Sequence, residues 1–371
     1  MKRQNTIVLI SLLVIIGGVI FYIESVKPLR LAGLGDKTVN LGELDDLAKQ
    51  EKAAKYGPAR EIVSPAGFIN VESLNLQDLI GKKVILLDFW TYSCINCQRT
   101  LPYLTGWYEK YKDQGLEIVG IHTPEFEFEK KIENVKWATE KYSIKYPVVL
   151  DNDYGTWNNY RNRYWPRKYL IDIDGFIVYD HIGEGGYQET EKKIQALLAE
   201  RAKVLNQPTV IAGDMVNPQA VETVSGDYRR SPEIYFGSWR NDALGNGRRN
   251  WPGEQNFSAP KSIKTNALYL VGNWDINKEY AQNLAADVRI IFRYQAQKVF
   301  MVAGADSPVG LKILVDGKAI DSRVGSDVID GTVTVKEERL YRIIEDQAAG
   351  EHTLEIIIQN PGLRAFTFTF G

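Results

Sequence analysis

The chain has 371 residues, which exceeds one ordinary domain and favours two. Its 45 basic and 47 acidic residues nearly cancel to a net charge of -2, so it lacks the basic signature of a nucleic-acid-binding protein. Two cysteines exclude a disulfide scaffold, and together with three scattered histidines they do not readily supply a tetrahedral zinc site. We therefore expect no metal or other cofactor.

Residues 7–23 form an apolar run long enough to cross a bilayer. Lys2 and Arg3 precede it, so the positive-inside rule predicts a cytoplasmic tail over 1–6, a transmembrane helix over 7–23 and the bulk of the chain outside the cytoplasm at the cell membrane. A cleaved signal peptide is the alternative, but the run exceeds the usual hydrophobic region and no A-x-A site follows. Residues 24–66 are predicted to form a spacer.

The stretch Val84–Trp90 is a nearly continuous apolar run, which is typical of a strand covered on both faces of an α/β sheet. Helical spacing begins at Cys94, which opens a Cys-x-x-Cys pair with Cys97. The first turn of a helix has unpaired N–H groups and a partial positive charge, which favour a thiolate over a thiol. We therefore predict that Cys94 is the exposed nucleophile and that Cys97, one turn deeper, is the buried resolving thiol.

A second buried strand is predicted over 116–121, and it ends in His122-Thr123-Pro124-Glu125. Functional groups of α/β sheets gather at the carboxyl ends of strands. Glu125 is therefore a candidate for moving protons between the sulfurs and water, or only a charge at a helix N-terminus. His122 either tunes the thiolate or is a packed, hydrogen-bonded core residue.

Further along, Arg163-Tyr164-Trp165-Pro166 precedes two strands joined by the turn signal Asp174-Gly175. Pro166 opens the first of these strands. The other elements expected here are a helix over 128–142, a strand over 146–150, a short helix over 154–160 and a closing helix over 187–205. They complete a predicted α/β domain over 67–205.

Residues 206–230 mix Pro, Gly, Asn and Asp without periodicity, which indicates a linker. From 231 to 371 the pattern changes to short, often alternating runs rich in β-formers, which predicts an antiparallel β-sandwich. We place Trp239, Trp251 and Trp274 in its loops or strand edges, where they either stack on a sugar ring or belong to the core.

Asp88-Phe89-Trp90, the cysteine pair and Pro102 together resemble the thioredoxin superfamily. The stretches DFWTYSCINC and HTPEF are more similar to the extracytoplasmic TlpA, ResA and DipZ group, especially the soluble part of DipZ. This resemblance implies a thioredoxin fold with the TlpA-type insertion, followed by a jelly-roll-like β-sandwich similar to carbohydrate-binding modules. Tyr235-Phe236-Gly237 and the closing Phe368-Thr369-Phe370-Gly371 match the pattern of that second domain.

The resemblance also implies an activity, which is thiol-disulfide exchange through a redox-active Cys94–Cys97 disulfide with protein thiols or disulfides, in the direction of a reductase. In it Asp88 assists deprotonation of Cys97. Pro166 has a cis peptide bond, lies against the cysteine pair and, with Trp165, forms the substrate-binding edge. Electrons would come from a membrane-embedded donor of the CcdA/DsbD type.

Two other functions are compatible with the sequence. Thr91 to Cys94 has the T-x-x-C spacing of a peroxiredoxin, although Leu87 stands where that family has proline and the second cysteine is then unexplained. An anchored scaffold or glycan-binding protein, with a cell-surface glycan as ligand and an idle cysteine pair, is the alternative from another class.

Overall fold

The computed structural model describes residues 41–208, 213–219, 221–222, 230–320 and 322–371, without the side chains of 41–46. The chain divides into two units after Ala54. In the first unit the described residues belong to helix α2 (Leu41–Lys55). No helix among the described residues has the length and hydropathy needed to cross a membrane, and the predicted anchor over 7–23 lies outside them.

The second unit begins with an α/β domain around a six-stranded sheet of order β1-β4-β3-β2-β5-β6. Strands β2, β3 and β4 are parallel, and the other strands pair antiparallel to their neighbours. The elements are β1 (Gly67–Ile69), β2 (Val84–Trp90), α3 (Ile95–Tyr111), β3 (Leu116–His122), α4 (Ile132–Lys141), β4 (Val148–Leu150), α5 (Gly155–Asn159), β5 (Arg167–Ile171), β6 (Ile177–Ile182) and α6 (Tyr187–Val204).

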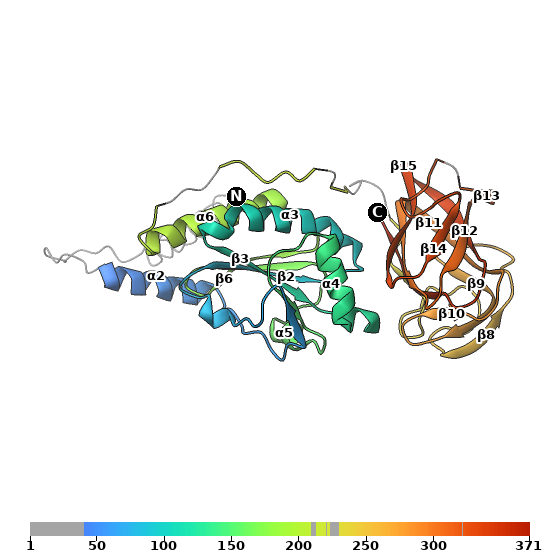
Figure 1. Ribbon diagram of the computed structural model, residues 1–371, viewed down its shortest axis with the longest axis horizontal. Coiled ribbons are helices and arrows are strands. Elements are labelled where there is room, and N and C mark those ends of the chain that lie inside the picture. The colour runs from blue at the N-terminus through green and yellow to red at the C-terminus, as the bar shows by residue number, and fades with distance from the viewer. Residues whose placement is uncertain (1–40, 209–212, 220, 223–229, 321) are drawn as a thin grey trace, which may run out of the picture. The chain divides into compact units, whose positions relative to one another are not determined.

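Strand β2 lies inside the sheet and has all seven residues buried, as its apolar run predicts. Because side chains alternate along a strand, Leu86 and Trp90 pack with residues of α3, α4 and α6 on one face. Leu87 and Phe89 pack with α5 on the other. Figure 1 shows α3 and α6 on one side of the sheet and α5 on the opposite side. Two helix-bearing faces bury β2 completely, and its carboxyl end leads into the cysteine pair.

Residues 57–66, which the sequence analysis assigns to a spacer, are bonded to this α/β domain. The backbone N–H of Ala59 donates to the Gly175 carbonyl at 2.8 Å, and Ala66 donates to the Leu150 carbonyl at 2.8 Å. The carboxylate of Glu61 accepts hydrogen bonds from the backbone of Leu76 at 2.9 Å. This segment therefore passes from the turn between β5 and β6 to the end of β4 before β1 begins.

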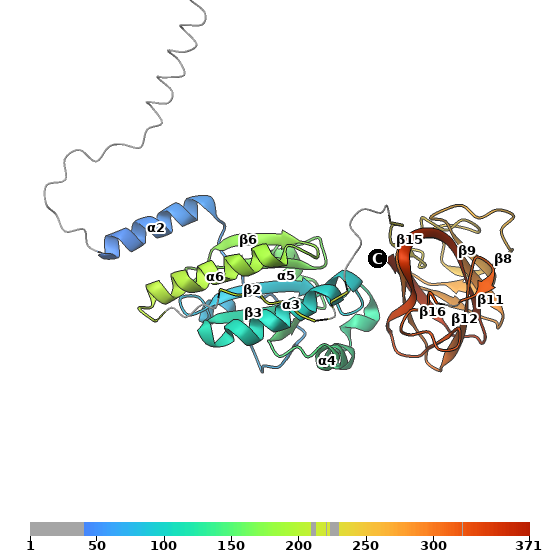
Figure 2. The same cartoon turned by 90° about the horizontal axis from the view of Figure 1, so that it is seen from above.

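The rest of the second unit is a β-rich domain whose strands join in one ten-stranded sheet. Strands β11, β15 and β16 lie side by side in it (Figure 2). The strands are β7 (Ile234–Tyr235), β8 (Gly253–Phe257), β9 (Leu268–Ile276), β10 (Ala281–Asn283), β11 (Val288–Gly304), β12 (Val309–Val315), β13 (Lys318–Ala319), β14 (Thr332–Val335), β15 (Arg339–Ile358) and β16 (Arg364–Phe370).

The two ends of strand β11 pair with different neighbours. Residues 289–292 pair with β9, whereas residues 299–304 pair with β16. Since β10 joins β9 to β16, the ladder closes on itself and surrounds one apolar core. The sequence pattern predicts separate strands at 288–294 and 298–302, but they form one strand with a register shift between Ala296 and Lys298. Such an irregularity interrupts the alternation that sequence patterns detect.

One of the three tryptophans of this domain does not lie where the sequence predicts. Trp274 lies in β9 between two neighbouring strands and is fully buried, so its placement in a loop or at a strand edge is wrong. Trp239 and Trp251 are 62% and 55% exposed. Lys278 lies over the first ring and Arg248 over the second. A glycan ligand for these two side chains stays a prediction.

Side chains of the β-rich domain enter the hydrophobic cluster of the α/β domain. Phe300, Val302, Leu340 and Phe366 belong to the same buried cluster as the residues around Cys97. The Phe366 ring lies 4.8 Å from that of Phe128 between centroids. Apolar burial of this kind stabilises the contact, so the β-rich domain packs directly on the end of the sheet that carries the cysteines.

Candidate active site

The cysteine pair lies at the start of helix α3, as its spacing predicts. Cys94 is the N-cap residue with extended backbone angles, and its Sγ accepts a hydrogen bond from the backbone N–H of Cys97 at 3.4 Å. Both cysteines are free thiols, Cys94 half-buried and Cys97 buried. Burial raises the pKa of Cys97 well above its ordinary value, and the hydrogen bond and charge of Cys94 and the charge of Asp88 raise it further. The two sulfurs are therefore unequal: Cys94 is accessible, and Cys97 needs help to lose its proton.

Asp88 is buried in β2 beneath the pair. Burial raises its pKa from 3.8 to about 7, although the charge of Lys168 lowers it. Its Oδ1 atom has no hydrogen-bond partner among the described residues. A carboxyl group with a pKa near neutrality can accept a proton at physiological pH, and its electrostatic influence reaches Cys97. Asp88 is thus placed to take the proton of the deeper thiol.

Lys168 stands opposite Asp88 in the neighbouring strand β5. It is buried, and its Nζ donates to the Gly183 carbonyl at 3.2 Å. Burial lowers its pKa, while the charges of Asp88 and Cys97 work in the opposite direction. A lone lysine inside a strand carries no motif, so the sequence did not indicate a role for Lys168. The alternation of side chains along β5 does not show that Lys168 pairs with Asp88 in the neighbouring strand.

A second buried carboxyl group, Glu129, joins the two loops that line the site. One of its oxygens accepts from the backbone N–H of Ser93 at 3.3 Å and from the Ser93 hydroxyl at 2.6 Å. The other accepts from the backbone N–H groups of Glu125 at 2.6 Å and Phe126 at 3.0 Å. Burial raises the pKa of Glu129 to about 7, against the effect of these hydrogen bonds. Glu129 thereby fixes the residue before Cys94.

His122 is fully buried at the end of β3, and its ring stacks on Tyr92 with 5.8 Å between centroids. Its Nε2 lies 3.4 Å from the Thr91 hydroxyl. Burial lowers its pKa to about 3, so the imidazole is neutral at physiological pH. Of the two interpretations in the sequence analysis, the structure agrees with the packed core residue, because a neutral ring supplies no positive charge to a thiolate.

Glu125 is held by two residues of the β-rich domain. Its Oε1 accepts from the Tyr235 hydroxyl at 2.9 Å and pairs with Arg240 at 2.7 Å. The guanidinium of Arg240 also lies 3.7 Å from the centre of the Tyr235 ring. These partners come from more than a hundred residues away along the chain, so the sequence could not indicate them. Glu125 faces the same cavity as Cys94.

The structure also brings the loop before β5 to this cavity. The peptide bond between Trp165 and Pro166 is cis. Trp165 is half-buried, donates from Nε1 to the Thr123 carbonyl at 3.0 Å and lines the cavity with Cys94. Pro166 is buried, and its carbonyl accepts from the backbone N–H of Gly183 at 2.8 Å.

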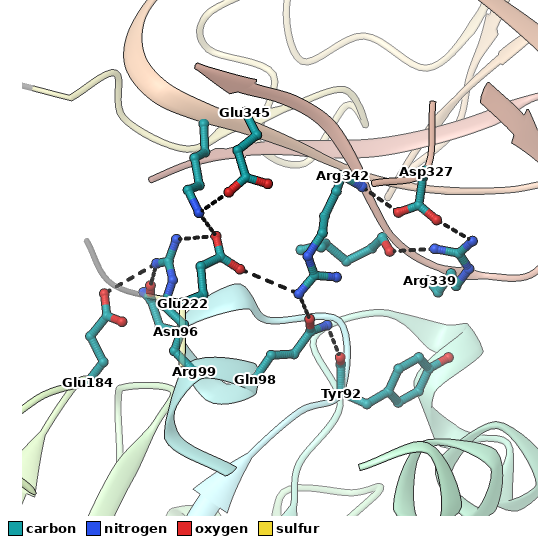
Figure 3. A network of polar contacts seen from close by, with 12 residues as sticks. Tyr92, Asn96, Gln98, Arg99, Glu184, Glu222, Asp327, Arg339, Arg342 and Glu345 are labelled. Atoms are coloured by element: carbon teal, nitrogen blue, oxygen red, sulfur yellow. Dashed lines mark hydrogen bonds and ion pairs between the residues drawn. The ribbon is translucent and has the colours of Figure 1, made fainter. Parts of the chain in front are cut away.

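Polar contacts tie the first turns of α3 to the β-rich domain (Figure 3). Gln98 donates to the Tyr92 carbonyl at 2.8 Å and accepts from Arg342 of β15 at 3.3 Å. Arg99, which is 3% exposed, pairs at 3.4 Å with both Glu184 and Glu222. Glu222 in turn lies between cations of the β-rich domain, Lys298 at 3.3 Å and Arg342 at 3.5 Å. Partly buried networks are screened less than surface pairs, so these contacts fix the helix that carries the thiols.

The pKa of Asp88 predicts a pH-dependent stability. Its pKa is about 7 in the folded protein and near 3.8 in an unfolded chain, so the folded state binds more protons between these values. We expect the free energy of unfolding to fall as the pH rises from about 4 to about 7. Each unit of difference between the folded and unfolded pKa values contributes about 1.4 kcal/mol to this fall. Denaturant unfolding of the reduced protein across this range measures it.

The variant Asp88→Asn should flatten this pH dependence and be more stable than the wild type above pH 7, whereas Asp153→Asn, at an exposed aspartate, should keep it. A residual slope from Glu129 is expected, since its pKa is raised from 4.5 in the same direction. If the free energy of unfolding of Asp88→Asn depended on pH as strongly as that of the wild type, the raised pKa of Asp88 would be contradicted.

Two family models match the chain. The AhpC/TSA family matches residues 64–180, and the "Thioredoxin like C-terminal domain" matches residues 231–371. The first range covers the cysteine pair and most of the six-stranded sheet. The second range covers the β-rich domain.

Curated relatives also match the chain. Protein DipZ of Mycobacterium tuberculosis is 35% identical over 351 residues, which are 93% of this chain and 47% of DipZ. The chain therefore spans about half the length of that relative. Thiol-disulfide oxidoreductase ResA of Bacillus cereus is 33% identical over 34% of this chain and 69% of ResA. Thiol-disulfide oxidoreductase YkuV of Bacillus subtilis is 29% identical over 38% of this chain and 95% of YkuV.

These matches confirm the thioredoxin-like fold and the β-rich C-terminal domain that the sequence predicts. The chain belongs to the thioredoxin-like thiol-disulfide oxidoreductases of the TlpA, ResA and DipZ type.

Proposed function

We propose that this protein is a membrane-anchored, extracytoplasmic enzyme that reduces disulfides of partner proteins through Cys94 and Cys97. The observation that carries the proposal is the inequality of the two thiols. Cys94 is half-buried at a helix N-terminus and lines a cavity of about 750 Å³. Cys97 is buried behind it, beside a carboxyl group whose pKa is near neutrality.

The reaction follows from this arrangement in two exchanges. The Cys94 thiolate attacks one sulfur of the partner disulfide, forming a mixed disulfide and releasing the partner's other sulfur as a thiolate. Asp88 then takes the proton of Cys97, and the Cys97 thiolate attacks Cys94 Sγ. This step forms the Cys94–Cys97 disulfide and releases the second partner thiol, so two electrons pass from the enzyme to the partner. The reverse sequence oxidises a partner.

Three further residues at the site have proposed supporting roles. Trp165, which lines the cavity, and the buried Pro166 next to it form the edge against which a partner segment lies, since an extended segment can bind along such an edge. Glu125 passes a proton between the cavity water and the leaving sulfur. Its contacts with Tyr235 and Arg240 support this role, because they hold its carboxylate at the cavity wall.

The variant Cys97→Ser tests the exchange directly. It keeps the attacking thiol but cannot resolve the mixed disulfide, so partner proteins should accumulate as covalent adducts that a reductant releases. Non-reducing electrophoresis of cells that express the full chain measures these adducts. Cys94→Ser is the matched control and should give none. Equal adduct levels in the two variants would contradict the assignment of Cys94 as the nucleophile.

The proposed location rests on the apolar run at 7–23 and the basic residues before it. With the redox site outside the cytoplasm, its electrons would come from a membrane-embedded donor of the CcdA/DsbD type. Cell fractionation with a cysteine-directed reagent that does not cross membranes measures both features. We expect the chain in the membrane fraction and Cys94 labelled in intact cells; labelling only after lysis would refute the proposed orientation.

The AhpC/TSA match favours thiol peroxidase as a second candidate function. Thr91 stands three residues before Cys94, but its hydroxyl faces His122 at 3.4 Å. The buried Cys97 and Asp88 are better explained by disulfide exchange. Consumption of hydrogen peroxide by the reduced protein distinguishes the two functions: we expect turnover far slower than reduction of a protein disulfide, and the opposite order would establish the peroxidase.

A further inference from the structure

The cavity in front of Cys94 has walls from both domains of the second unit. The α/β domain contributes Cys94 and the loop with Arg163 and Trp165, and the β-rich domain contributes Tyr235 and Thr369 among others. An incoming protein therefore meets the thiol between two walls rather than on an open face. An extended segment of polypeptide suits such a space.

From this site we infer that the β-rich domain is part of the substrate site, and that the cavity selects extended polypeptide segments with acidic side chains next to the disulfide-bonded cysteine. The inference rests on the proposed function and adds the class of substrate. It rests on which charged groups of the cavity form salt bridges and which do not, and on the buried hydroxyl group of Thr369.

The carboxylates of the cavity already have partners. Glu125 is paired with Arg240, and Glu184 with Arg99. Glu233 accepts a hydrogen bond from the Tyr235 hydroxyl at 2.8 Å.

Two arginines of the cavity are in the opposite situation. Arg163 and Arg230 line it, are exposed and form no salt bridge within 4 Å with any described residue, although the charge of Arg230 acts on Glu184 and works against the burial that raises the pKa of that carboxyl group. Arg163 lies two residues before Trp165, next to the edge proposed to receive the partner. Unpaired guanidinium groups bind carboxylates through bidentate hydrogen bonds. The cavity that contains Cys94 thus presents positive charge to an acidic side chain of a bound segment.

Thr369 supplies the independent observation. It is 6% exposed, lines the cavity from strand β16, and its Oγ1 has no hydrogen-bond partner among the described residues. By contrast, the hydroxyl of Thr367 on the same strand donates to the Ile234 carbonyl at 3.0 Å. A buried hydroxyl without a partner is costly, and a hydrogen bond to the backbone of a bound segment would satisfy it.

The test uses the reduced full-length chain and two synthetic peptides of equal length. Each has one cysteine in a disulfide with 2-thiopyridine, flanked by aspartates in one peptide and by lysines in the other. Attack by Cys94 on the peptide sulfur releases 2-thiopyridone, whose absorbance gives the rate. We expect the acidic peptide to react roughly tenfold faster at low salt, and the ratio to shrink as ionic strength rises.

Variants assign this preference to residues. The double variant Arg163→Gln, Arg230→Gln should bring the ratio of the two rates close to one. Arg248→Gln, at an exposed arginine of the β-rich domain outside the cavity, should leave the ratio as in the wild type. Thr369→Val should slow both peptides, and Thr369→Ser should restore their rates, because serine returns the hydroxyl group.

The outcomes separate this inference from the proposed function. Equal rates with the two peptides in the wild type, or a preference that survives the double arginine variant, would overturn the inference and leave disulfide reduction intact. The small neutral disulfide 2,2′-dipyridyl disulfide serves as the reference substrate. A wild-type chain that reduces neither it nor the peptides would overturn the proposed function, and the substrate preference with it.

Discussion

The burial of ionisable groups around the first turn of α3 is the constraint on which the site depends. Asp88 and Glu129 are both withdrawn from water, and burial holds the pKa of each near 7. A buried carboxyl group costs free energy unless it is paired or hydrogen-bonded. Glu129 offsets that cost with four hydrogen bonds, whereas Asp88 Oδ1 has no hydrogen-bond partner in the described part of the chain and the nearby charge of Lys168 is its compensation. The less satisfied group is the one placed to exchange a proton.

The two carboxyl groups divide the work at the cysteine pair. Asp88 acts from beneath, where its electrostatic influence reaches Cys97. Glu129 acts from the side, where it fixes Ser93 and thereby the approach of the chain to Cys94. Positioning of this kind matters for exchange, because the two sulfurs must approach in line to form their bond.

The β-rich domain contributes side chains that contact the residues of the active site. Phe366 packs on the aromatic rings after β3, Arg342 reaches Gln98 in α3, and Tyr235 and Arg240 hold Glu125. These contacts combine apolar burial with partly buried charge pairs, which resist screening by salt. The same contacts place the wall opposite Cys94, so stability of the domain contact and access to the thiol are linked.

The sequence by itself determined the local features: the buried strand Val84–Trp90, the helix that begins after Cys94, and the depth of Cys97 one turn later. Apolar periodicity and the residues that mark helix ends extend over only a few residues, so both can be recognised in the sequence itself. Only the tertiary structure decided that Lys168 meets Asp88, that Glu129 reaches Ser93, and that Thr369 faces the cavity. Both residue pairs are 36 or more residues apart along the chain, and no local pattern encodes which distant strand or loop will be the neighbour.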